Sequence, residues 1–178
     1  VSCNEESEKR ELLRLKSQEK TEAVFKIIND NWAFQQPQPS SQVASLLLDW
    51  KEWRDFTTAI KQKPKSTIGA FRKQSKLLAD LSMKMNYNMP KMYDNAQFKS
   101  RISVLTTQLQ SLDLYLNLQD IPTDKVLVII KDVNVGVSSL QNQMEQMLIK
   151  ASIPKEEGES EMIKLLDTTR AIKTNSIQ

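Results

Sequence analysis

Two neighbouring segments of the chain space their large apolar residues by alternating steps of four and three. The first segment covers 94–119 and the second covers 123–151. This spacing is typical of the seam between two antiparallel helices, and Asp94 is the expected N-cap of the first helix. The series are Phe98, Ile102, Leu105, Leu109, Leu112, Leu116 and, in the second segment, Val126, Ile130, Val133, Val137, Leu140, Met144, Met147.

The remaining apolar pattern predicts three more long helices and one short one. The long helices are expected over 5–30, 42–61 and 66–86, with Pro37, Pro39 and Pro64 between them as breaks. The short helix follows a loop at 154–158. Its residues expected to face inward are Met162, Leu165, Leu166 and Ile172.

One stretch allows a second interpretation. Val126 to Val137 is rich in β-branched residues and includes Gly136, so a local pair of strands is an alternative to helix. We favour helix because the apolar spacing continues past Gly136 unbroken. The sequence therefore predicts an all-α fold, an antiparallel up-and-down bundle of four to five long helices plus a short C-terminal helix. Residues 1–22 would form an anchor and charged stalk, 23–174 the bundle and 175–178 a frayed tail.

Composition agrees with this fold and excludes several kinds of chemistry. The 178 residues contain only three Gly and six Pro, which suits long helices with few turns. No apolar run approaches the ~20 residues needed to span a bilayer. There is no His, the commonest general base and metal ligand, and a single Cys excludes an internal disulfide or a thiolate zinc cluster.

That one cysteine lies where no core can form. Cys3 is followed by Asn4 and then by Glu5, Glu6 and Glu8. A free Cys is usually buried as a small apolar residue, so this setting favours a modified Cys. A cytosolic protein with a chance Cys is the alternative.

Val1-Ser2-Cys3 resembles the end of the lipobox of bacterial lipoproteins, with Ser2 as the small residue before the acylated Cys. The acids after Cys3 resemble the stretch that follows this Cys in surface-exported lipoproteins of Bacteroidetes-type bacteria. The resemblance covers about eight residues. It implies a lipid on Cys3 and an extracytoplasmic position on the bacterial outer membrane, facing either the periplasm or the cell surface.

Positive charge is concentrated between residues 60 and 101. This segment contains ten Lys or Arg and only two acids, Asp80 and Asp94, which gives a local charge of +8. A solvated helix face is the ordinary interpretation, and a patch for an anionic surface is the alternative. The residues expected to cluster at one tip of the bundle are Lys61, Lys63, Lys65, Arg72, Lys73 and Lys76.

The methionines are a second group of interest, because thioethers are soft ligands that favour Cu(I). Four lie within ten residues, and an antiparallel hairpin would return two more to the same end of the bundle. Packing is the ordinary role of Met at irregular helix ends. The members are Met83, Met85, Met89, Met92, Met144 and Met147.

Acids and tryptophans form a third group. Asp49 and Glu52 share a helix face beside Trp50 and Trp53. Core tryptophans with surface ion pairs are the ordinary interpretation, and an aromatic platform for a sugar is the alternative.

We therefore expect a non-enzymatic, membrane-anchored lipoprotein with no cofactor. Its bundle would bind or scaffold another envelope component, either a protein or an anionic surface, and no nucleic acid. The alternative function is a Cu(I) binding or carrier protein that uses the Met group.

Overall fold

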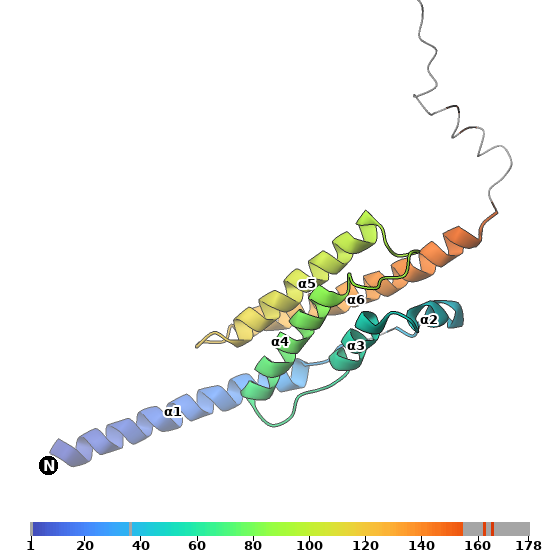
Figure 1. The fold of residues 1–178 in the computed structure, drawn as a ribbon. Coiled ribbons are helices and arrows are strands. Elements are labelled where there is room, and N and C mark those ends of the chain that lie inside the picture. Colours follow the sequence, from blue (N-terminus) through green and yellow to red (C-terminus); the bar gives the residue numbers. More distant parts are fainter. Residues whose placement is uncertain (1, 36, 155–161, 163–164, 166–178) are drawn as a thin grey trace, which may run out of the picture.

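The computed structural model describes residues 2–35, 37–154, 162 and 165. The described residues contain helices and no strands, so the predicted all-α bundle is confirmed and the strand alternative at 126–137 is wrong (Figure 1). The helices are α1 (Ser2–Asn31), α2 (Ser41–Leu47), α3 (Lys51–Ile60), α4 (Ile68–Lys84), α5 (Ala96–Leu116) and α6 (Thr123–Ser152).

The centre of the bundle is the antiparallel hairpin of α5 and α6, with α4 packed against α5 (Figure 1). All six apolar residues predicted for the α5 seam are buried, and so are the first six predicted for α6. Met147, the seventh, is half-buried. The two helices are less equal than expected, because α5 has 21 residues and α6 has 30. The C-terminal end of α6 therefore extends past the start of α5.

The helix predicted over 42–61 is wrong as a single element. It is broken at residues 48–50 into α2 and α3. Trp50 lies at the break, fully buried, and its indole N–H donates to the carbonyl oxygens of Met85 (3.1 Å) and Tyr87 (3.2 Å). Because these acceptors lie at the end of α4, the break places the indole against a distant part of the chain.

The N-cap of α5 and the predicted C-terminal helix also differ from expectation. The N-cap of α5 is Asn95, not Asp94, because the Asn95 side chain accepts a hydrogen bond from the backbone N–H of Phe98 (2.9 Å). Met162 and Leu165, predicted to face inward, are 62% and 84% exposed. The rest of the predicted short helix, with Leu166 and Ile172, lies outside the described residues.

The segment between α1 and α2 is held along α6 by two side chains. Asn134 accepts a hydrogen bond from the backbone N–H of Gln35 (2.8 Å) and donates to the carbonyl of Ala33 (2.9 Å). Glu145 accepts from both the backbone N–H and the hydroxyl of Ser40, at 2.7 and 2.8 Å. Since Ser40 also caps α2, these bonds fix where α2 begins.

The N-terminal half of α1 extends away from the other helices (Figure 1). Every residue from Glu5 to Ala23 is exposed, and Val24 is the first to be half-buried. The first ion pair to the bundle joins Lys20 to Asp120 in the turn between α5 and α6 (2.6 Å). Residues 2–16, which we call the stalk, are thus roughly 22 Å long at 1.5 Å per residue.

Candidate ligand groove between α5 and α6

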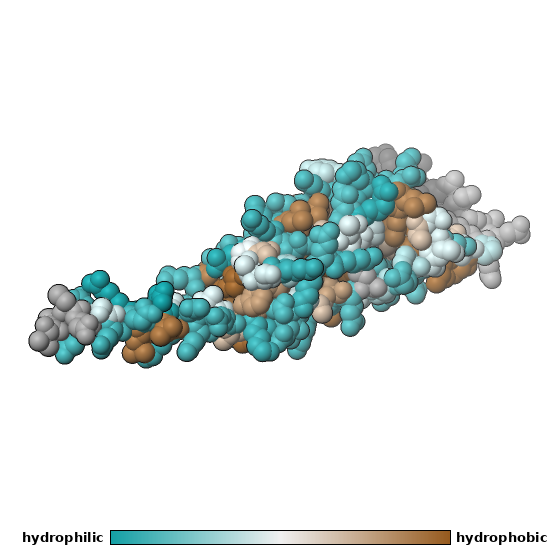
Figure 2. All heavy atoms as spheres, turned by 90° about the horizontal axis from the view of Figure 1, so that it is seen from below, coloured by the Kyte–Doolittle hydropathy of each residue, from teal (hydrophilic) through white to brown (hydrophobic). Residues whose placement is uncertain are grey.

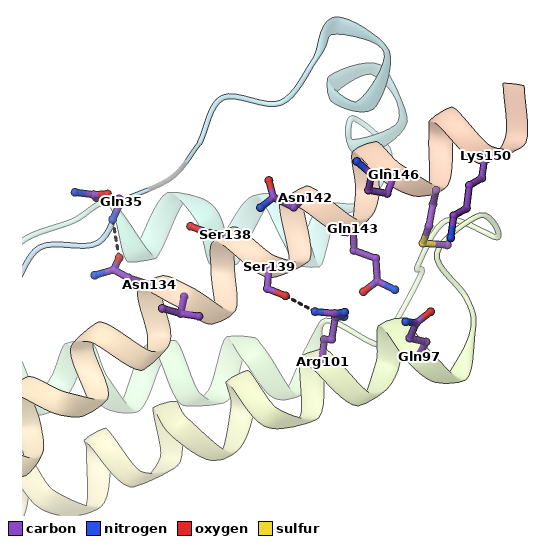
Figure 3. Close-up of a pocket in the computed structure, with 12 residues that line it drawn as sticks. Gln35, Gln97, Arg101, Asn134, Ser138, Ser139, Asn142, Gln143, Gln146 and Lys150 are labelled. Atoms are coloured by element: carbon purple, nitrogen blue, oxygen red, sulfur yellow. Dashed lines mark hydrogen bonds between the residues drawn. The ribbon is translucent and has the colours of Figure 1, made fainter. Parts of the chain in front are cut away.

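An open groove of about 660 Å³ lies over the N-terminal half of α5 and the C-terminal half of α6 (Figure 3). It forms because α5 is the shorter helix and its first turns diverge from the end of α6. The lining is polar: six carboxamides, two serines and two cations, with only Val135 and Met147 as apolar members. The polar members are Gln35, Gln97, Arg101, Asn134, Ser138, Ser139, Asn142, Gln143, Gln146 and Lys150.

Several of these side chains point into the space between the two helices (Figure 3). Arg101 of α5 donates a hydrogen bond to the hydroxyl of Ser139 of α6. The Oε1 atom of Gln143 is buried and has no hydrogen-bond partner in the described structure. A buried amide oxygen without a partner loses the solvation that it has in water. Gln143, in the wall of the groove, therefore carries an unsatisfied acceptor.

A second hollow of about 290 Å³ continues the groove along the hairpin and shares Arg101, Val135 and Ser139 with it. Its floor is a close approach of the two helices at Gly136. A Cβ at this position would meet Gln108 Oε1 at 3.2 Å and Leu105 Cδ1 at 3.3 Å. Gln108 Oε1 is also buried without a partner, so unsatisfied acceptors occur in both hollows.

The predicted basic tip consists of five lysines and Arg72. The lysines are exposed, whereas Arg72 donates a hydrogen bond within the bundle. Arg72 is half-buried, and its Nε donates to the carbonyl of Leu116 at the end of α5 (2.7 Å). Lys76 pairs with Asp80 at 3.6 Å. Arg72 is thus occupied in capping α5, whereas the five lysines at the tip are exposed to solvent. These are Lys61, Lys63, Lys65, Lys73 and Lys76.

The methionines are distributed between core and surface. Met85 and Met144 are fully buried, while Met83 is 46% exposed with its sulfur accepting from Gln110 Nε2 (3.4 Å). Met147 returns to the start of α5, where its sulfur lies 3.9 Å from Asn95 Nδ2. Met89 and Met92 are half-buried against the core. Cu(I) binding stays a prediction.

The acid and tryptophan group does not form a platform. Trp50 and Trp53 are both buried and stack on each other, with ring centroids 5.5 Å apart. Glu52 accepts a hydrogen bond from Asn88 (2.8 Å). The ordinary interpretation, two core tryptophans, is correct. Acylation of Cys3, in the first turn of α1, stays a prediction.

Two of the twelve lining residues are singled out by the sequence: Arg101, within the basic segment, and Met147, among the methionines. The other ten lie on α5, on α6 and, for Gln35, in the segment before α2, and they were not singled out. A signal for them exists in the run Gln141-Asn142-Gln143 with Gln146 one turn later. An amide-rich run of this kind on a seam helix is unusual, because exposed helix faces more often carry Lys and Glu.

Comparisons with known proteins identify no relative: no protein-family model, no curated protein and no solved structure matches the chain. Within the described residues, no helix has the length and apolar character needed to cross a bilayer. Nor do three or more Cys, Asp or Glu side chains gather there as a metal site.

Proposed function

We propose that this protein is a lipid-anchored component of the bacterial cell envelope that binds another envelope component through its α5–α6 groove. Cys3 carries the lipid, and the bundle is extracytoplasmic. The protein acts by binding and not by catalysis.

The observation that supports this proposal is the exposed stalk. Cys3 lies in the first turn of α1, at the end remote from the bundle (Figure 1). A helix with exposed residues on all sides adds little to the stability of a bundle, because burial of apolar surface is the main stabilising term. As a spacer it is useful: it places the bundle roughly 20 Å from an anchored Cys3.

The surface of the stalk fits a spacer better than a membrane-lying helix. Its exposed leucines, Leu12, Leu13 and Leu15, are flanked by charged residues, and the face of the stalk seen in Figure 2 has one small hydrophobic area. Ion pairs between residues one turn apart, such as Glu6 with Arg10 (2.9 Å), stabilise the helix without a partner helix. A helix that lies on a membrane instead needs a continuous apolar face.

Metabolic labelling tests the anchor. Cells expressing the full-length gene are fed an alkyne-tagged fatty acid and fractionated. We expect the label on the wild type and on Leu13→Ala, a matched stalk variant, and both in the membrane fraction. Cys3→Ser should be unlabelled and released. Retention of unlabelled Cys3→Ser in the membrane fraction would contradict the proposal.

Site-specific photocrosslinking tests binding. A photoreactive residue at Asn142, in the groove, should capture an envelope component in intact cells. The same residue at Lys131, exposed on α6 outside the groove, should not. Equal capture at both positions, or none at either, would show that the groove is not the binding surface.

A further inference from the structure

The charged residues that line the groove are all basic. Arg101 and Lys150 are exposed cations, and none of the twelve lining residues is acidic. Glu145, the acid on α6 within the same turns, directs both carboxylate oxygens to Ser40 in the segment before α2. A ligand in the groove therefore meets two cations and no opposing carboxylate in the lining, which favours an anion.

A simple anion would leave part of the groove unsatisfied. The buried Gln143 Oε1 accepts hydrogen bonds and needs a donor, which a carboxylate, sulfate or phosphate dianion cannot supply. The carboxamides Gln97, Asn142 and Gln146 each offer both a donor and an acceptor. The hydroxyl groups of a carbohydrate also do both, so a carbohydrate chain can offer partners to both groups of each of these carboxamides.

We infer that the groove binds an anionic oligosaccharide, with its carboxylate or other oxyanion on Arg101 and Lys150 and its hydroxyls on the carboxamides. This inference rests on the proposed function and names the class of envelope component that is bound. The open shape of the groove suits an extended chain over a single small molecule. The continuation past Ser139 is lined by Asp132, so it suits an uncharged residue of that chain and not its anionic group.

Two other classes of macromolecule fit less well. Protein interfaces are anchored by buried aromatic and large apolar side chains, whereas the apolar lining is limited to Val135 and Met147. Single-stranded nucleic acids need aromatic rings for base stacking, and the lining has none. The same lack of rings removes a stacking surface for neutral sugars, so the ion pairs must supply much of the affinity.

The basic tip is a separate surface. Arg72 contacts Leu116, at the C-terminal end of α5, whereas the groove lies over the N-terminal half of that helix. Variants can therefore distinguish binding in the groove from adhesion of a polyanion to exposed lysines at the tip.

The test is calorimetry and a glycan array with the lipid-free chain. Probes are uronic-acid oligosaccharides of four to six residues among other acidic glycans, neutral oligosaccharides of equal length, and a polyglutamate peptide of equal charge. Variants are Arg101→Gln, Lys150→Gln and Gln143→Leu, with Lys131→Gln as the charge-matched control. Lys61→Gln/Lys63→Gln/Lys65→Gln reports on the tip, and circular dichroism checks that each variant folds.

We expect at least one acidic glycan to bind, with affinity reduced about tenfold by each cation variant, the loss expected for one charge-assisted contact. Gln143→Leu should weaken acidic glycan but not polyglutamate, and Lys131→Gln should change neither. Equal binding of polyglutamate, loss only in the tip variant, or no acidic glycan bound above neutral ones would overturn the inference. The anchor test at Cys3 and the crosslink at Asn142 are unaffected by that outcome, so the proposed function would fail or stand separately.

Discussion

α1 and α6 are both helices of 30 residues, yet they are stabilised in different ways. From Glu5 to Ala23, α1 is exposed on all sides, and ion pairs within this part join residues three or four apart. α6 buries eight residues, among them Val133 and Leu140, and contacts α5, α1 and α2. The comparison shows that a helix can be continuous in this protein without belonging to its core.

The difference originates in the spacing of apolar residues. In α6 they recur by four and three over the whole helix, whereas in the stalk Leu12, Leu13 and Leu15 are the only large ones. A seam needs a repeated contact with a partner helix, while a spacer needs only helix propensity and charge. The measurements below test this contrast, from the largest expected effect to the smallest.

Truncation of the seam should have the largest effect. Leu109→Ala and Leu140→Ala should each lower the free energy of unfolding by ~2–5 kcal/mol, because each leaves a cavity between fully buried neighbours. Leu13→Ala, in the exposed stalk, should change it little. Urea denaturation measures all three. A loss below ~0.5 kcal/mol at both seam positions would show that the predicted heptad phase is wrong.

High pH should destabilise the bundle through Tyr93. Burial, and to a lesser degree the Glu145 carboxylate, raises the pKa of Tyr93 to about 12 from 10.0. The folded state thus favours the neutral phenol, and its contribution is fully present below pH 10.0 and lost as pH rises to about 12. The loss of stability should be on the order of 2 kcal/mol. Tyr93→Phe should remove this part of the pH dependence; an unchanged profile would contradict the assignment.

Trp50→Phe should lower stability by roughly 1–3 kcal/mol, because the carbonyl oxygens of Met85 and Tyr87 lose the indole donor. Trp32→Phe is the matched control: Trp32 is also buried, but its indole N–H has no partner in the described structure. Its substitution should cost less. Thermal unfolding of both variants compares them, and a larger loss at Trp32 would mean that ring packing outweighs the hydrogen bonds.

The stalk should show the smallest effect. Glu6→Gln removes an exposed ion pair with Arg10, and pairs of this kind contribute only a few tenths of a kcal/mol. Global unfolding should not change measurably. Hydrogen exchange should instead show faster amide exchange in residues 5–16 than in α6, in both wild type and variant. Protection of the stalk equal to that of α6 would mean that the stalk has a partner.

The heptad series were sufficient to predict the α5–α6 hairpin from the sequence, since a seam between helices follows from local periodicity. The charged, poorly apolar start of α1 likewise predicted a helix outside the core. The break before Trp50 was not predictable in this way, because the apolar stripe runs through it. It depends on hydrogen bonds from the indole to carbonyls 35 and 37 residues away.

The groove, too, was decided only by tertiary structure. Arg101, Gln143 and Lys150 follow no apolar period and lie on two helices. They share a groove because α6 is longer than α5 and the pair diverges at that end. Periodicity in a sequence reports which residues avoid water, and so it determined the core of this protein. Which polar residues face each other across a groove depends on helix lengths and crossings, which only the packed bundle sets.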